Sequence, residues 1–264
     1  MIVMERVFAI AKLTFVKLRE PAFLMLMAVG ACLGSVSSEM GTLMFREGNS
    51  LVATLIVYKI GEPVLSNFSL IVFVVFIVSV FSGATEIPRD VKSRMIMLIL
   101  AKPVSRWEYL LGKFLGVLTM GLAFLAVSFS AVVAAHFLKT GSFYPPGVLM
   151  RQILLALVVL PCVAISVAVS TFLPEIASMV LAVLYMIAAV AVASIGILVE
   201  MLPHSLNAGG AVYSVYYLFP NFIFYFNSFH PFGLVSFALL VYTLSVTAIL
   251  LWIAWCRLSF RDMV

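Results

Sequence analysis

Several apolar stretches, most of them long enough to cross a lipid bilayer as a helix, constrain this chain more than any other feature. A membrane-spanning helix needs about 20 mostly apolar residues. With 64% hydrophobic and 10% charged residues and a mean hydropathy of +1.22, the composition is far from that of a soluble domain. We expect an all-α integral membrane protein with six transmembrane helices. They are predicted at residues 22–38, 68–81, 114–138, 152–173, 176–199 and 233–255.

The basic balance of the chain, with a pI of about 9.2, does not indicate a nucleic-acid partner. The Lys and Arg residues lie beside the apolar stretches, where orientation in the membrane explains them. The cysteines, Cys32, Cys162 and Cys256, fall within apolar stretches and are expected to be small core residues. The three histidines are scattered, so neither a metal site nor a bound cofactor is predicted.

Residues 1–20 are predicted to form an amphipathic helix that lies in the membrane interface. At 100° per residue, Val7, Ile10, Ala11 and Thr14 gather on one side. The opposite side is basic, as in interfacial helices. The basic residues of this helix are Arg6, Lys12, Lys17 and Arg19. A solvated segment leading into the first span is the alternative.

Residues 82–113 form a polar island between the second and third apolar stretches of the membrane domain, residues 21–264. Pro88 suits the first turn of a helix, and Ser105 and Glu108 have the spacing of a capping box. The pattern predicts a short transverse helix from Pro88, a break at Lys102-Pro103, and a new helix that runs into the third span.

The distribution of basic residues predicts the orientation. All but four of the 16 Lys and Arg residues lie in the N-terminal segment, the polar island or the C-terminal tail, which six spans would place on one side. Excess Lys and Arg marks the cytoplasmic side. Both termini and the island are therefore expected to be cytosolic. The four remaining residues are Arg46, Lys59, Lys139 and Arg151.

Residues 200–232 lack Lys and Arg and are rich in Tyr and Phe, which favours an extracytoplasmic re-entrant segment at the membrane–water boundary. An aromatic belt without a gating role and an exit gate for a lipid-like substrate are both open. The candidate gate residues are Tyr213, Tyr217, Pro220, Asn221 and Phe222.

The polar island resembles the signature of ABC-2 type permeases, the membrane subunits of bacterial ABC exporters. The resemblance lies in an acidic residue after the second span, a Pro-Val-Ser-Arg run, and a Gly-Lys pair before the third span. These residues are Glu86, Pro103-Val104-Ser105-Arg106, Tyr109-Leu110 and Gly112-Lys113. The segment Tyr217 to Asn221 is similar to the Pro-Asn stretch that these proteins have before the last span.

The resemblance implies a dimer of permease chains, either identical or sister chains, in the bacterial cytoplasmic membrane. Each chain is expected to contact one cytosolic ABC ATPase through the N-terminal helix and the polar island, giving two ATPase copies. The expected coupling residues are Glu86, Arg89, Asp90, Lys92, Arg94 and Arg106. Arg106 is expected to pair with Glu86 or Asp90, or to support the contact itself.

The chain has no Gly-x-x-x-x-Gly-Lys-[Ser/Thr] phosphate loop, so ATP and Mg²⁺ are expected to bind to the partner. This chain is therefore not expected to be an enzyme, and a membrane-embedded enzyme would need several His, Asp or Glu residues converging within the spans. Another alternative is a membrane anchor that transports nothing and transmits force to a periplasmic or cell-envelope partner. A periplasmic accessory protein would fit either role.

Overall fold

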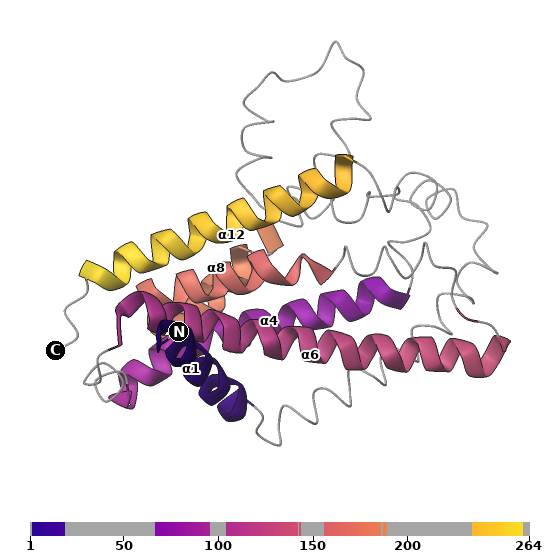
Figure 1. Cartoon of the computed structure of the whole chain (residues 1–264), viewed down its shortest axis with the longest axis horizontal. Coiled ribbons are helices and arrows are strands. Elements are labelled where there is room, and N and C mark those ends of the chain that lie inside the picture. The colour runs from indigo at the N-terminus through magenta and orange to yellow at the C-terminus, as the bar shows by residue number, and fades with distance from the viewer. Residues whose placement is uncertain are drawn as a thin grey trace, which may run out of the picture.

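The computed structural model describes residues 2–18, 67–95, 104–141, 156–185 and 234–260, together with residues 143, 187 and 188. Within these residues every regular element is an α-helix. The predicted all-α fold is therefore confirmed for the part of the chain that is described. Four helices, α4, α6, α8 and α12, form an elongated bundle, and the N-terminal helix α1 crosses one end of it (Figure 1).

Helix α1 comprises Ile2–Leu18 and confirms the predicted N-terminal helix. The apolar stripe of α1 was expected to lie in the membrane interface. Its residues Val7, Ile10, Ala11 and Thr14 are instead buried in the protein. They lie against helix α6, where a Cβ atom on Gly112 would stand 2.6 Å from the Cβ atom of Ile10. Glycine permits this close approach of two helices. The stripe is thus a helix–helix contact and does not face lipid.

Helix α4 comprises Asn67–Lys92 and continues through Pro88 without a break. The prediction that Pro88 begins a new transverse helix is wrong. A proline inside a helix removes the hydrogen bond to the carbonyl four residues earlier, here that of Ala84. The hydroxyl of Ser178 donates to this carbonyl oxygen at 3.0 Å. A neighbouring helix therefore satisfies the acceptor that Pro88 leaves free.

Helix α6 comprises Arg106–Thr140 and confirms the predicted start of a new helix at Ser105. The Ser105 side chain accepts from the Glu108 backbone N–H at 3.2 Å, and the Glu108 carboxylate accepts from the Ser105 N–H at 2.7 Å. This reciprocal pair is the predicted capping box. The helix ends at Gly141, whose φ of 66° is left-handed and suits a residue without a Cβ atom.

Helix α8, Val159–Phe172, lies between α4, α6 and α12 and is buried on nearly all sides. This fits its uniformly apolar sequence, because a helix that is hydrophobic all round has no face suited to water. Pro161 in the first turn of α8 follows an irregular turn at Leu157 and Val158. There the Leu160 N–H donates to the Leu157 carbonyl oxygen. Pro161 has no N–H and therefore cannot donate to this carbonyl.

A shorter apolar helix, Glu175–Tyr185, follows α8 after the turn at Pro174. Helix α12 comprises Leu234–Phe260 and overlaps the predicted sixth span, residues 233–255, from residue 234 onward. Among the described residues, Arg106–Ser130 of α6 and Phe237–Phe260 of α12 are long and apolar enough to cross a membrane. The count of six spans stays a prediction.

One end of the bundle brings several polar segments together. The C-terminal ends of α4 and α12 and the N-terminal end of α6 lie on the left in Figure 1, and α1 packs against α6 there. The turn between α8 and the next helix joins the same end, because Glu175 lies 2.7 Å from Arg89. This end contains the candidate site.

Candidate coupling site

A buried group of charged residues joins α4 to α6. Glu86 and Asp90 lie one helical turn apart on α4, and both have 0% exposed surface. Tyr109 and Lys113 have the same spacing on α6, so two matched pairs face each other. The Lys113 ammonium lies 2.8 Å from Glu86 Oε2 and 2.7 Å from Asp90 Oδ2. The Tyr109 hydroxyl donates to Asp90 Oδ2 at 2.9 Å.

The N-terminal helix contributes one more cation to this group. Lys17 Nζ lies 3.0 Å from Asp90 Oδ1 and 3.9 Å from Glu86 Oε2, and its side chain is 34% exposed. We call the five residues Lys17, Glu86, Asp90, Tyr109 and Lys113 the charge cluster. It draws on α1, α4 and α6, and therefore connects the N-terminal helix to two long helices of the bundle.

The charge cluster is electrically balanced, with two carboxylates and two ammonium groups. Burial by itself would raise the pKa of the Asp90 carboxyl. The positive charges of Lys113 and Lys17 and their hydrogen bonds outweigh that effect, so the pKa of Asp90 lies below its usual value. Asp90 is therefore ionised at neutral pH.

Glu86 differs from Asp90 in one respect. Its Oε1 atom is buried and accepts no hydrogen bond from the described residues. A buried charge depends on its partners, because removing one of them leaves the other without compensation. Glu86 thus relies mainly on Lys113, with Lys17 at a longer distance.

Arg106 holds the end of α12. Its Nη1 atom donates to the carbonyl oxygens of Leu258 and Ser259, each at 2.7 Å. The last carbonyls of a helix lack partners within the helix, and a cation there also suits the helix dipole. Next to this contact, the rings of Trp107 and Trp255 meet edge to face, with centroids 6.1 Å apart. Arg106 thus joins the start of α6 to the last helix.

The other predicted coupling residues lie at the surface. Arg89, Lys92 and Arg94 are exposed, and Arg94 has a left-handed backbone with a φ of 55° just after α4 ends. Arg89 Nε donates to Glu175 Oε1 at 2.7 Å across to the turn after α8. The six predicted coupling residues therefore have three different environments. Two are buried, Arg106 contacts the end of α12, and the other three are exposed.

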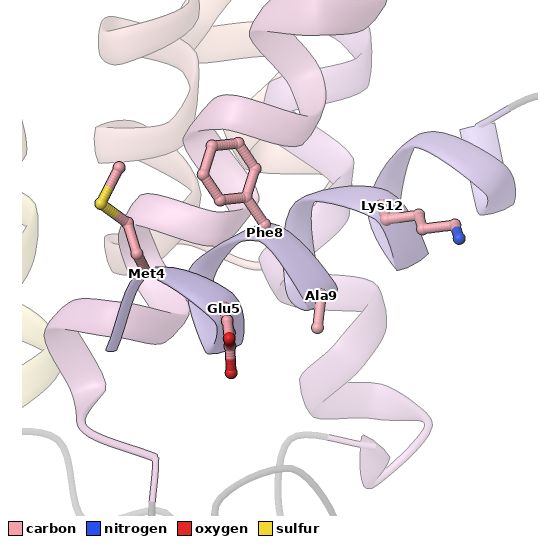
Figure 2. A pocket seen from close by; sticks show the side chains of 5 residues that line it. All are labelled: Met4, Glu5, Phe8, Ala9 and Lys12. Atoms are coloured by element: carbon pink, nitrogen blue, oxygen red, sulfur yellow. The ribbon is translucent and has the colours of Figure 1, made fainter. Parts of the chain in front are cut away.

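The basic residues predicted for the interfacial helix also differ from one another. Lys12 is exposed and lines a shallow hollow of about 560 Å³ on the outer side of α1, together with Met4, Glu5, Phe8 and Ala9. Figure 2 shows Met4 and Phe8 projecting to one side of α1 and Glu5 to the other. Lys17 belongs to the charge cluster, and Arg6 is half-buried.

Some predicted residues lie outside the described part of the chain. These are Arg19, residues 96–103 of the polar island with the predicted break at Lys102-Pro103, and the candidate gate residues Tyr213, Tyr217, Pro220, Asn221 and Phe222.

Lys113 and Tyr109 were not among the predicted site residues, although both belong to the quoted motif. The available signal was their spacing of four residues on a helix, which matches the spacing of Glu86 and Asp90 on the preceding helix. A lysine about two turns into an apolar helix needs a buried partner. Glu86 and Asp90 are nearby acidic residues with the right spacing.

Comparison with protein-family models gives a match over residues 61–259 to the model described as ABC-2 family transporter protein. This range includes α4, α6 and α8 in full, and α12 as far as residue 259. The chain belongs to the ABC-2 transporter family. A comparison with curated proteins found no match. Membership makes the chain a transmembrane permease of an ABC transporter, and confirms the resemblance inferred from the polar island.

Membership in the ABC-2 family has consequences for the site. Such permeases are generally the membrane component without enzymatic activity, and they work with an ABC ATPase. Most of the charge cluster lies within the matched range, whereas Lys17 comes from α1, which precedes it. The structure thus adds a contact between the N-terminal helix and the family domain.

Proposed function

We propose that the chain is the permease subunit of an ABC exporter, with six spans and both termini in the cytosol of a bacterium. Two permease chains form the pathway. Two copies of a cytosolic ATPase bind ATP and Mg²⁺ and drive the movement of substrate outward. The polar end of the bundle, with α1, the end of α4 and the start of α6, is the end that meets the ATPase.

The observation that carries this proposal is the charge cluster. It is buried, balanced in charge, and formed by side chains of α1, α4 and α6. A conformational change needs an element that transfers force from the partner to the membrane helices. Because Lys113 and Lys17 hold the same two carboxylates, movement of α1 also displaces α4 and α6. The cluster is therefore suited to transmit motion and is too buried to be the contact surface.

The arrangement of the helix ends supports the predicted orientation. The end of α4, the start of α6, the turn after α8 and the end of α12 meet at one end of the bundle. Successive spans cross the membrane in opposite directions. These ends are therefore expected to meet if the polar island, residues 173–175 and the C-terminal tail share one side of the membrane. The basic residues near these segments favour the cytosol for that side.

The exposed residues of the site then contact the ATPase, and the buried residues transmit the motion. Lys92 and Arg94 are free of the charge cluster and lie at the surface where α4 ends. Arg106 extends the path, because it attaches the start of α6 to the carbonyls that end α12. A displacement of the polar island is thereby passed to both α4 and α12.

The test is purification of the complex with charge reversals at the surface. The double variant Lys92→Glu/Arg94→Glu should insert normally but retain about tenfold less ATPase, as expected for loss of paired charges at an interface. Lys139→Glu, near the other end of α6, is the matched control and should retain the ATPase. Equal retention by both variants would contradict the proposed contact.

The orientation is checked in the same preparation. In a background without the three native cysteines, Ser93→Cys should react with an impermeant thiol reagent only after the inner side is opened. Phe143→Cys, just after α6 ends, should react from outside. External labelling at Ser93 would overturn the orientation.

A further inference from the structure

All three tryptophans of the chain lie in the region where the start of α6 meets the end of α12. Trp107 is in the first turn of α6, and its ring meets that of Trp255 edge to face, with centroids 6.1 Å apart. Trp252 precedes Trp255 by three residues, so the two share one side of α12. We call these three residues the tryptophan face.

The tryptophan face is open to the surroundings of the bundle. Trp252 is 59% exposed, and Trp107 and Trp255 are each 37% exposed. An indole ring combines a large apolar surface with one N–H donor, and tryptophan is therefore enriched at the boundary between lipid chains and water. The tryptophan face indicates that this boundary lies at the junction of α6 and α12.

An apolar stripe of α12 continues from the tryptophan face toward the other end of the helix. Its residues recur at spacings of three and four, which places them on the same side as Trp252, and all of them are exposed. They are Phe237, Val241, Leu244 and Ala248. Because α12 is long and apolar enough to cross a membrane, this stripe is suited to contact with lipid chains.

The opposite end of the tryptophan face is basic. Arg106 is half-buried, and its Nη1 atom donates to the carbonyl oxygens of Leu258 and Ser259. These bonds position the guanidinium about one turn beyond Trp255. A guanidinium presents five N–H donors in a planar fork that suits phosphate oxygens. The only acidic residue in the first turn of α6, Glu108, is buried and accepts from the Ser105 N–H in the capping box.

We infer that the tryptophan face and Arg106 form a binding site for an anionic phospholipid of the cytoplasmic leaflet. The headgroup phosphate lies at Arg106, and the acyl chains follow the apolar stripe of α12. The positive charge of Arg106 favours an anionic lipid over a zwitterionic one. A protein from the cytosol fits less well, because the stripe continues along a helix long enough to span the membrane.

The bound lipid adds a second connection between the start of α6 and the end of α12, beside the hydrogen bonds of Arg106. The choice of leaflet rests on the orientation given under the proposed function. The site itself does not depend on the ATPase, so it can be tested on the full-length chain in a bilayer.

The experiment uses the intrinsic fluorescence of the chain, which reports on this site because there is no other tryptophan. The full-length chain is reconstituted in phosphatidylcholine. Part of that lipid is then replaced by dibrominated phosphatidylglycerol or, in parallel, by dibrominated phosphatidylcholine, since bromine quenches indoles in contact with it. We expect the anionic lipid to bind about fivefold more tightly, as one Arg at an anionic membrane surface predicts. Equal quenching by the two lipids would overturn the inference.

Two variants locate the preference. Arg106→Gln removes the charge but keeps a donor for the carbonyls of α12, and it should abolish the preference for the anionic lipid. Arg257→Gln is the matched control, because Arg257 is exposed near the same end of α12 but lies over the Phe172 ring of α8. It should keep the fivefold preference. Equal loss in both variants would mean a diffuse attraction to basic residues and would overturn the site.

The test holds even where Arg106→Gln does not insert. Arg106→Lys keeps the charge and should keep most of the preference, and the comparison of lipids in the unaltered chain decides by itself. Quenching by aqueous iodide but not by brominated lipid would also overturn the inference, because the tryptophans would then face water. None of these results concerns the ATPase, so the proposed function would stand. External labelling at Ser93 would instead overturn the orientation and move the site to the other leaflet.

Discussion

The last two turns of α4 have two faces that differ in burial and in charge. Glu86 and Asp90 point into the bundle, are fully buried, and are held by Lys113 and Lys17. Arg89 and Lys92, from the same seven residues of sequence, are exposed. The inward face is acidic and is neutralised by cations from other helices. The outward face is basic, with its nearest described acidic partner, Glu175, at the surface.

This difference separates two roles that the polar island seemed to combine. A buried, hydrogen-bonded ion pair is sensitive to loss of either partner, whereas an exposed pair is screened by water and contributes little to stability. Substitutions on the inward face should therefore change folding of the permease. Substitutions on the outward face should change contacts with other molecules and leave the fold intact.

Lys113→Ala should have the largest effect. It leaves Glu86 and Asp90 buried with Lys17 as the remaining cation, and breaking a buried pair in this way costs about 3–5 kcal/mol. We expect a sharp loss of thermal stability in detergent and of the folded fraction in membranes. Lys92→Ala on the outward face is the matched control and should change the melting temperature little. Similar melting temperatures for the two variants would remove the distinction between the faces.

Gly116→Ala should have an intermediate effect. An added Cβ atom would stand 2.6 Å from the Thr14 Cβ atom and 2.9 Å from the Ala11 carbonyl oxygen, so α1 must move away from α6. Overpacking of this kind costs about 1–3 kcal/mol. Because Lys17 comes from α1, the shift should also weaken its contact with Asp90, which a crosslink between cysteines on α1 and α6 would detect.

Ala126→Val is the control for Gly116→Ala, since Ala126 lies on the exposed side of the same helix. It should leave both the stability and the crosslink unchanged. If Gly116→Ala behaves like this control, the close contact between α1 and α6 is not required to assemble the inward face.

Arg89→Ala should have the smallest effect on stability, about 0–1 kcal/mol, because the Arg89 side chain is half-exposed. A double-mutant cycle with Glu175→Ala would measure the pair directly, by thermal unfolding of the four proteins. A coupling energy as large as that of a buried pair would mean that the outward face also holds the fold together.

Much of the fold was predictable because its signals are local. The capping box at Ser105 and Glu108 depends on residues three apart, and it placed the start of α6 correctly. The helical repeat of apolar residues in the N-terminal segment indicated α1. The apolar stretches at 152–173 and 233–255 indicated α8 and α12, although α8 begins seven residues later than predicted and α12 ends five residues later. Helix formation and apolar length are properties of adjacent residues, and sequence reports them directly.

The candidate site was predictable only in part. Sequence placed Glu86 and Asp90 in it, and Arg106 was expected either to pair with one of them or to support the contact itself. Arg106 contacts the end of α12, and Lys113 pairs with both carboxylates. Such pairing depends on which side of α6 faces α4. The choice is made by packing of several helices at once, and the order of residues along one helix does not specify it.

The amino-acid sequence by itself determined that this chain is a helical membrane protein, that its polar island begins a new helix at Ser105, and that it resembles the ABC-2 permeases. The tertiary structure decided which charges are buried and whether Pro88 begins a new helix or lies within α4. Pro88 is accommodated because a hydroxyl from another helix, that of Ser178, reaches the carbonyl it leaves free. The buried charges and the accommodation of Pro88 have the same physical reason. Polar groups without partners are costly away from water, and the groups that pair with them here are far away in sequence.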